Sequence, residues 1–430
     1  MRKSKMFMLG IMTMGMVVST ALPTDLPTAP LTAVSVYADT ITAQGKCGDN
    51  AVYKYDSETK TLTISGTGAM WDDYGFAKSL VETKKIVIEK GIQTIGSYSF
   101  KNLFDVTEVV IADTVTTIKN DAFERVEGTI EIPKSVVKVE EFAFTGAKKF
   151  VIRGDVKGYE ALALGNGYND EVVLYGDAQD LGKALYFKDD ATITIAIENT
   201  KCKVSNGCLL SSDSKELYYC ISARDTLEIP DTIETISVAA CSDRSIKKLV
   251  LGKNVKKIGA YAFASTSIKT IVTNKKLTDI GVKAFYDTKI KNVNFRGKVK
   301  LGVSAFSGST TIKNLKKFKY SQTTIKTAKL GKSKYNISFA KVSDAKGYQI
   351  RVKKGKKTYK YTTNKNSYTK KAPKTLTKDY KAKKDYTIYS DEYLTNTEGA
   401  AYVTIRPYKV SKGKKVYGKW SEKTVLNSYK

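Results

Sequence analysis

The hydrophobic and polar positions of this 430-residue chain follow one short pattern that returns many times. In LVLGKNVKKIGAYAF (249–263), an apolar run is followed by apolar residues spaced by three and then by an Ala-Phe pair. Within each run of copies the pattern recurs every 21 to 23 residues, at 86–100, 109–123, 130–144, 227–241, 249–263, 271–285 and 293–306. A unit this short cannot bury its own apolar side, so neighbouring units must stack as a solenoid.

Each apolar position of the unit predicts one column of the stack. The run Leu249–Leu251 predicts a short strand lying beside Ile271 and Val293 of the next units. The residues spaced by three predict a second inward column: Val255 with Ile258, and likewise Ile92 with Ile95, Val115 with Ile118, and Ile233 with Ile236. Ala262 is small enough for neighbouring units to approach, and Phe263 is expected to fill the space between layers.

These residues resemble the BspA-like leucine-rich repeat of secreted bacterial proteins. Residues 45–73 look like the β-hairpin cap that precedes such repeats, and residues 203–230 look like a hairpin cassette that interrupts them. Two stretches depart from the pattern: 149–168 lacks the Ala-Phe ending, and 176–200 has no repeat match. We expect a distorted turn of the solenoid there.

From about Phe318 the period of the pattern changes to two. Alternating stretches at 335–342, 346–355, 357–363 and 401–410 predict short strands of a β-sandwich. Their order resembles a fibronectin type III domain, with Phe339 where a core Trp usually stands. Ala401 departs from the expected tyrosine, and 371–400 is long for this fold, which predicts an inserted loop or hairpin.

The composition limits the kinds of catalysis and metal binding that this chain can support. Histidine is absent, which excludes Ser-His-Asp and Cys-His catalysis and removes the commonest catalytic zinc ligand. Asp and Glu are scattered, so no carboxylate pair for glycoside hydrolysis is singled out. We therefore predict no enzyme activity, no catalytic residues, no cofactor and no metal site.

The first residues predict an exported protein. MRKSKMFMLGIMTMGMVVSTAL has a basic start and a short apolar stretch, and Val36-Tyr37-Ala38 resembles a cleavage site. We predict a signal peptide cleaved after Ala38 and a secreted or cell-surface location. The alternative is an uncleaved membrane anchor, which the short, Met- and Gly-rich run disfavours.

Five cysteines stand at 47, 202, 208, 220 and 241, without the spacing of a metal site. Cys241 stands in the Phe column, and Cys208 stands where cassettes of the kind it resembles usually carry an aliphatic residue, so we expect both to substitute for core residues. Cys202, Cys208 and Cys220 lie in one predicted hairpin region, where one disulfide among them is a further hypothesis. A reactive thiol is not expected, because no base is evident.

The positive charge is concentrated at the C-terminal end. Residues 316–430 hold 31 Lys/Arg and 7 Asp/Glu, which is +24 of the chain's +29. The lysines at predicted hairpin turns are the candidate polyanion-binding residues: Lys353, Lys354, Lys356, Lys357, Lys414 and Lys415. They either bind an anionic polymer or protect exposed strand edges from aggregation, and the sequence leaves both open.

The predicted fold class is mainly β, a leucine-rich-repeat solenoid followed by an immunoglobulin-like β-sandwich. The predicted domains are a signal peptide (1–38), an N-terminal hairpin cap (39–80), the solenoid (81–315) with a hairpin cassette near 200–222, and a basic fibronectin type III-like domain (316–430).

The resemblance implies a non-enzymatic binding or adhesion protein whose repeat surface recognises a protein or glycan on a host or neighbouring cell. An anionic cell-wall polymer is a further expected partner, and nucleic acid is not expected. The alternatives are a cell-envelope scaffold held to wall polymer by the basic domain and, disfavoured, a glycan-processing enzyme.

Overall fold

The structure is a computed structural model that describes residues 41–72, 75–165, 170–185, 192–222, 224–307, 310–314, 321–331, 333–373, 376 and 401–426. The predicted signal peptide and its alternative, a membrane anchor, lie outside these residues. Helix α1 (Leu181–Ala184) is four residues long, and no described helix has the length and hydropathy of a membrane span.

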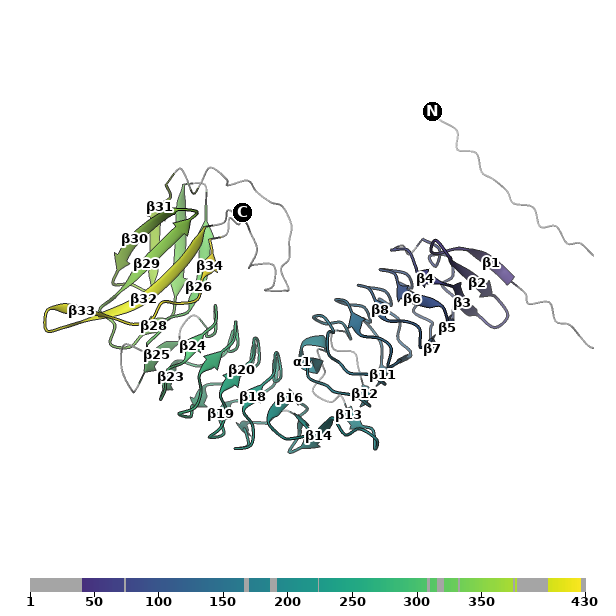
Figure 1. The fold of residues 1–430 in the computed structure, drawn as a ribbon, viewed down its shortest axis with the longest axis horizontal. Coiled ribbons are helices and arrows are strands. Elements are labelled where there is room, and N and C mark those ends of the chain that lie inside the picture. Colours follow the sequence, from purple (N-terminus) through teal and green to yellow (C-terminus); the bar gives the residue numbers. More distant parts are fainter. Residues whose placement is uncertain are drawn as a thin grey trace, which may run out of the picture. The chain divides into compact units, whose positions relative to one another are not determined.

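The first half begins with an antiparallel hairpin layer that continues directly into a stack of parallel strands. The antiparallel strands are β1 (Ile41–Lys46), β2 (Ala51–Asp56) and β3 (Thr61–Gly66). The parallel strands that follow, one per turn, are β5 (Lys85–Ile88), β7 (Glu108–Ile111), β9 (Thr129–Ile132), β11 (Lys149–Ile152), β12 (Glu171–Leu174) and β13 (Thr192–Ile195). Successive turns lie side by side in register (Figure 1), with Ile86 opposite Leu62 and Val109.

A second strand in each of the turns that begin with β3, β5, β7 and β9 forms the second inward column. These strands are β4 (Gly68–Ala69), β6 (Ile92–Ile95), β8 (Thr117–Ile118) and β10 (Lys138–Val139). Ile92, Ile95, Val115 and Ile118 are all fully buried, so the predicted column is confirmed.

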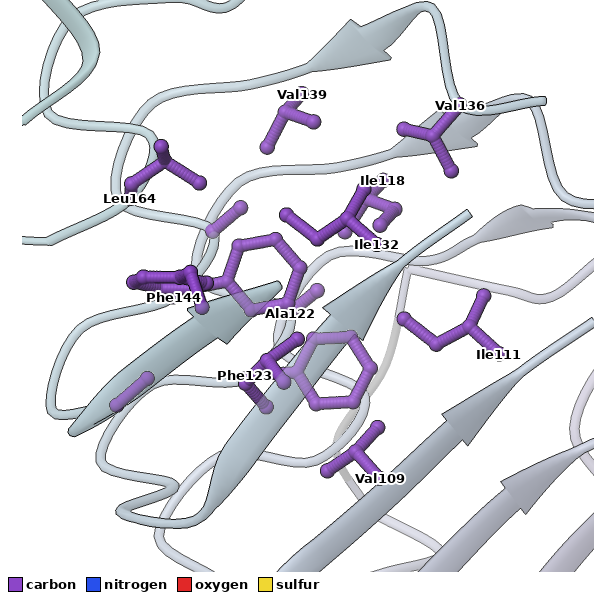
Figure 2. Close-up of a cluster of buried hydrophobic side chains, with 14 of the residues drawn as sticks. Val109, Ile111, Ile118, Ala122, Phe123, Ile132, Val136, Val139, Phe144 and Leu164 are labelled. Atoms are coloured by element: carbon purple, nitrogen blue, oxygen red, sulfur yellow. The ribbon is translucent and has the colours of Figure 1, made fainter. Parts of the chain in front are cut away.

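The Ala-Phe pairs form a third column, in the turns that follow the second strands. The Phe123 N–H donates to the carbonyl of Ala143 in the next turn at 2.8 Å. The Phe123 and Phe144 rings stack with centroids 5.1 Å apart, inside a cluster of aliphatic side chains (Figure 2). The residues two before and two after Phe123, Asp121 and Arg125, both have positive φ, which folds the backbone tightly around the buried ring.

The stretch 149–200 continues the solenoid with altered turns. Ala163 and Leu164 occupy the place of the Ala-Phe pair, and the Leu164 N–H donates to the carbonyl of Ala184 in α1 at 2.9 Å. Strands β11, β12 and β13 pair in register through this region. A leucine therefore serves in the aromatic column, although the stretch 176–200 has no recognisable repeat motif.

The hairpin cassette separates two apolar cores. It consists of β14 (Cys202–Ser205), β15 (Cys208–Ser211) and β16 (Glu216–Cys220). Leu209 and Tyr219 pack with the first half of the solenoid, whereas Leu210 and Leu217 pack with the second half. Both faces of this hairpin are therefore buried, and it closes each core.

The second half repeats the arrangement of the first. Its first column contains β17 (Thr226–Glu228), β19 (Lys248–Val250), β21 (Thr270–Val272), β23 (Asn292–Phe295) and β25 (Thr311–Asn314). Its second column, which continues from β16, contains β18 (Thr235–Ile236), β20 (Lys257–Ile258), β22 (Asp279–Ile280) and β24 (Lys300–Leu301). Leu249 lies opposite Ile271, and the Phe285 ring stacks on Phe263 at 5.3 Å and on Phe306 at 5.0 Å.

The C-terminal module (residues 321–426) consists of antiparallel sheets. One sheet contains β26 (Ile325–Leu330), β27 (Lys334–Phe339) and β31 (Ser367–Lys371). The other contains β29 (Gly347–Lys354), β30 (Lys357–Thr363), β32 (Tyr402–Ser411), β33 (Lys414–Tyr417) and β34 (Thr424–Val425). The short β28 (Lys341–Val342) pairs with β25 of the solenoid.

These sheets enclose a core of their own that contains Tyr335, Phe339 and Tyr348. The mainly β fold class is confirmed, and this module is compatible with a β-sandwich. Its fibronectin type III character stays a prediction. The expected insertion in 371–400 falls mostly at 374–375 and 377–400, outside the described residues.

Candidate functional site

A groove of about 400 Å³ crosses the second-column strands of the second half of the solenoid. Four strands, β18, β20, β22 and β24, each contribute the residue before their buried aliphatic side chain and one or two residues after it, and Gln179, Asp180, Glu216 and Glu422 complete the lining. The lining residues are Gln179, Asp180, Glu216, Thr235, Ile236, Ser237, Val238, Lys257, Ile258, Gly259, Asp279, Ile280, Gly281, Val282, Lys300, Gly302 and Glu422.

Glycines form part of the floor of this groove, because no side chain fits there. A Cβ on Gly281 would lie 2.5 Å from the backbone nitrogen of Ala260, and one on Gly302 would lie 2.5 Å from that of Val282. Gly259 is equally close to the backbone of Ser237, at 2.6 Å. The recurring Ile-Gly pair thus lets one turn lie directly on the next and leaves the surface above it open.

A column of charged side chains runs beside the glycines. Because β16, β18, β20, β22 and β24 are parallel and in register, Glu216, Thr235, Lys257, Asp279 and Lys300 lie next to one another in that order. Adjacent members are about 4.8 Å apart along the stack. Lys300 also forms an ion pair with Glu422 at 3.4 Å, at one end of the groove. The column offers acidic and basic groups in a fixed order, which suits a polar partner with its own charge pattern.

The carboxyl of Glu216 lines the groove and is half-buried. Burial raises the pKa of its carboxyl; the hydrogen bond from Ser237 opposes this rise, and the nearby carboxylate of Asp177 adds to it. The Ser237 hydroxyl donates to this carboxylate at 2.8 Å. Within the described ranges, no three Cys, Asp or Glu side chains gather as a metal ion would require.

Ion pairs between neighbouring turns occupy much of the remaining surface of the solenoid. Examples are Lys85 with Glu108 at 2.8 Å, Arg153 with Glu131 at 2.7 Å and Lys253 with Asp231 at 2.6 Å. Each pair is exposed and contributes at most about 1 kcal/mol. These residues are therefore already paired with one another across neighbouring turns.

The six lysines predicted to bind polyanion do not form one cluster. Lys353, Lys354, Lys356 and Lys357 lie at the β29–β30 hairpin, and Lys414 and Lys415 lie at the β32–β33 hairpin. Lys353 is opposite Tyr402, whereas Lys414 is opposite Ser411 at the far end of β32. The two groups are thus about 30 Å apart at a rise of ~3.4 Å per residue. Lys357 and Lys414 stand on β30 and β33, the outer strands of this sheet path, where charge also protects an edge.

The cysteines differ in part from the prediction. Cys241 lies in the aromatic column as expected, but it forms a disulfide with Cys220, the member of the same column one turn earlier. The hypothesis of a bridge among Cys202, Cys208 and Cys220 is wrong, because Cys202 and Cys208 are free and buried. Burial raises the pKa of the Cys202 thiol to about 11 and also raises that of Cys208, so neither is a ready nucleophile.

The groove residues were not singled out from the sequence. The signal that marks them is their offset in the repeat: Lys257, Asp279 and Lys300 each stand immediately before the buried Ile or Leu of the second column. These positions belong to no catalytic motif, and the signal appears only when the copies are aligned and their outward positions are read as a column.

The comparisons with known proteins agree with this architecture. The sequence matches the BspA type leucine rich repeat region, in six copies, over residues 69–166 and 211–337, together just over half of the chain. No curated protein matches it.

Several solved structures are similar at low identity. One is the pneumococcal vaccine antigen PcpA, 16% identical, covering 63% of this chain and 82% of that one with a TM-score of 0.44. Another is a leucine-rich cell surface protein of Faecalibacterium prausnitzii, 14% identical, covering 62% and 87% with a TM-score of 0.43. A third is a leucine-rich repeat protein of Eubacterium ventriosum, 16% identical, covering 62% and 94% with a TM-score of 0.39. On the family match and the repeat geometry, this chain belongs to the BspA-type leucine-rich repeat proteins.

Proposed function

We propose that this chain is an exported, non-enzymatic binding protein of the cell surface, and that its solenoid recognises a protein or glycan partner through the groove of the second half. The observation that carries the proposal is the open column Glu216–Thr235–Lys257–Asp279–Lys300 above a floor that includes glycines. The column is rigid, because every position is fixed by the stacked core beneath it.

Two features support export. The first residues have the form of a signal peptide with cleavage after Ala38. The disulfide between Cys220 and Cys241 is of a kind that persists in oxidising compartments. Adhesion to a host or neighbouring cell is the role that fits such an exposed, rigid recognition surface.

The proposal is tested with the mature full-length chain and a charge-swap variant. The variant Lys257→Asp/Asp279→Lys keeps the net charge and reverses the order of charges in the groove. The matched control Asp225→Lys/Lys247→Asp swaps an exposed ion pair of 2.9 Å that lies outside the groove lining. Binding to immobilised matrix proteins, mucins and wall polymers is measured by surface plasmon resonance.

We expect at least one partner on this panel, and we expect its affinity to fall at least tenfold in the groove variant and less than twofold in the control. Equal binding by all three proteins would show that the groove is not the recognition surface. Failure of the wild-type chain to bind any member of the panel would contradict the adhesion role.

The envelope-scaffold alternative makes a different prediction. If the basic C-terminal module holds the chain to anionic wall polymer by charge, washing whole cells with 1 M salt should release the protein, since screening then acts within about 3 Å. Retention in high salt rules out the electrostatic anchor.

The glycan-processing alternative requires two carboxylates about 5–9 Å apart in a cleft. Carboxylates do line this groove, namely Asp180, Glu216, Asp279 and Glu422, so an assay decides the question. We expect no release of reducing sugar from any glycan that binds, with identical results for wild type and Glu216→Gln.

A further inference from the structure

Two arginines in the C-terminal module lie against aromatic rings on one face of a sheet. The guanidinium carbon of Arg351 is 4.1 Å from the centroid of the Trp420 ring. That of Arg406 is 4.5 Å from the same ring and 3.8 Å from the Tyr417 ring. The two guanidinium groups therefore share one tryptophan, and they can be no farther apart than the sum of their distances to it.

Lysines extend this arrangement in both directions along the sheet. Lys353 is two residues beyond Arg351 on β29 and lies opposite Tyr402 on β32. At the other end, the Lys415 Nζ lies 4.4 Å from the centroid of the Tyr408 ring. Side chains two residues apart on a strand share a face, so these groups form one strip. The distance along β32 from Tyr402 to Val410, which is opposite Lys415, is about 27 Å at ~3.4 Å per residue.

The strip has no acidic residues to neutralise it in the described part of the chain. Strands β29, β30, β32 and β33 contain no Asp or Glu, and the described acids of the module are Asp344 and Glu422. Glu422 is paired with Lys300 of the solenoid.

The positive charges of the strip also stand close together. Arg351 lies directly opposite Lys360 on β30, and like charges in this position destabilise a sheet. Burial lowers the pKa of the Arg406 guanidinium, and the charge of Arg351 lowers it further. A bound anion would relieve this repulsion.

The guanidinium groups are also held in fixed orientations. The Arg406 Nε donates to the Gln349 Oε1 at 2.8 Å, and the Arg351 Nε donates to the Thr404 Oγ1 at 3.3 Å. Both acceptors are neutral, so the charges are not cancelled. Planar guanidinium groups fixed in this way suit bidentate binding of a phosphate or sulfate oxygen pair.

We propose that the strip Lys353–Arg351–Arg406–Lys415 binds a linear sugar or polyol polymer that carries phosphate or sulfate esters. A polymer fits better than a single ion, because the charges extend along the sheet. Nucleic acid fits less well, because base binding needs free aromatic faces and here guanidinium groups lie over Trp420 and Tyr417. This site lies in a different module from the groove, so it does not depend on the groove proposal, and it gives the envelope-scaffold alternative named binding residues.

Fluorescence of Trp420 tests the proposal directly. The chain has two tryptophans, so Trp71→Phe leaves Trp420 as the single reporter. The mature full-length protein is titrated with poly(glycerol phosphate), heparin and single-stranded DNA of matched total charge. We expect a saturable change in Trp420 emission with one or both of the first two, at lower concentration than with DNA. No change with either polymer, or tighter binding of the DNA, would overturn the proposal.

Two variants that remove the same number of charges test which positively charged side chains bind the polymer. In Arg351→Gln/Arg406→Gln we expect at least a tenfold loss of affinity at 0.15 M NaCl, and a slope of log K against log salt shallower by up to about two. The control Lys354→Gln/Lys357→Gln also removes two positive charges. These two lysines lie opposite each other on β29 and β30, on the face of the hairpin that does not carry Arg351 and Lys353. This control should change the affinity less than threefold.

Circular dichroism and thermal unfolding verify that both variants are folded. If the arginine variant does not fold, Arg351→Lys/Arg406→Lys replaces it, which keeps the charge and loses the planar geometry, with an expected loss of at least threefold. Equal losses in the arginine and lysine variants would overturn the proposal, because they would show that total charge alone governs binding.

Discussion

Gly281→Ala tests the stacked architecture at the point where two turns come closest. The new Cβ would lie 2.5 Å from the Ala260 nitrogen and 2.6 Å from the Gly259 carbonyl carbon. Both are backbone atoms, which cannot rotate away as the end of a side chain can. At a glycine with ordinary φ and free space around it, the same substitution stabilises a protein by about 0.4–1 kcal/mol, because alanine lowers the conformational entropy of the unfolded chain. The sign of the change in stability therefore shows whether the contact between turns leaves room for a Cβ.

The magnitude follows from how far the turns must separate. Ordinary contact begins near 3.4 Å, so the turns must open by about 0.9 Å from a spacing of ~4.8 Å. Two hydrogen bonds between these turns, Gly281 N–H to the Ile258 carbonyl at 2.8 Å and Tyr261 N–H to the Val282 carbonyl at 2.9 Å, would then stretch beyond their normal range. Overpacking costs about 1–3 kcal/mol and each weakened bond about 0.5–1.5 kcal/mol. After subtraction of the 0.4–1 kcal/mol gained through the unfolded chain, we expect a net destabilisation of about 1–6 kcal/mol.

The assay is urea unfolding followed by circular dichroism, with hydrogen exchange of peptides from 249–306 to locate the loosened turns. Gly331→Ala is the control, since the nearest atom to its new Cβ is 3.3 Å away and its φ is ordinary. Stabilisation of Gly281→Ala, or an effect no larger than that of the control, would refute the claim that this glycine column is required by the contact between turns.

Three further predictions concern the same half of the solenoid. Phe285→Ala should cost about 3–5 kcal/mol in urea unfolding, because the ring is fully buried and stacks on two neighbours. Phe285→Leu should cost less, as Leu164 already serves in the equivalent column of the first half, and equal costs would contradict that reasoning. Reducing the Cys220–Cys241 disulfide, or Cys241→Ala, should lower stability by about 3 kcal/mol for a loop of 21 residues, with no further effect of reductant on the variant. Because the pKa of Glu216 is raised on folding, the native state holds more protons than the unfolded state, so the free energy of unfolding should fall as pH rises from about 4.5 through the raised pKa. Glu216→Gln should flatten this pH dependence of the free energy measured by urea unfolding, and an unchanged pH dependence would show that another group is responsible.

The buried columns could be predicted because burial constrains each repeat in the same way. Val255, Ile258 and Phe263 recur at fixed spacing, and all three are buried in the structure. The strands of the C-terminal module were predictable for a related reason: alternation at period two marks β29 and β32 because one face of each is buried.

The disulfide was missed because only cysteines close in sequence were considered as partners. In a solenoid, residues one repeat apart are spatial neighbours, and Cys220 and Cys241 are 21 residues apart. A separation of one repeat length therefore predicts this disulfide, provided that Cys220 is assigned to the aromatic column. Cys220 could not be assigned to that column from the sequence, because it lies in the cassette, where the apolar pattern changes to that of a hairpin.

The surfaces were harder to predict, because the physical rule that fixes the core leaves outward positions unconstrained. Lys257 and Asp279 could be exchanged without any change in the hydrophobic pattern, since both stand before a buried isoleucine. The arginine strip was missed for a similar reason: Arg351 and Arg406 are 55 positions apart, and only the pairing of β29 with β32 brings them together.

The glycine column links the packing of this solenoid to its surface. A side chain at Gly259, Gly281 or Gly302 would push neighbouring turns apart, so stability keeps these positions empty. The same empty positions form the floor of the groove and leave the column of Lys257, Asp279 and Lys300 beside it accessible. Substitutions in the charged column should therefore alter partner choice with little effect on folding, whereas substitutions in the glycine column should alter both. Comparing the charge-swap variant with Gly281→Ala in binding and in unfolding separates these two effects.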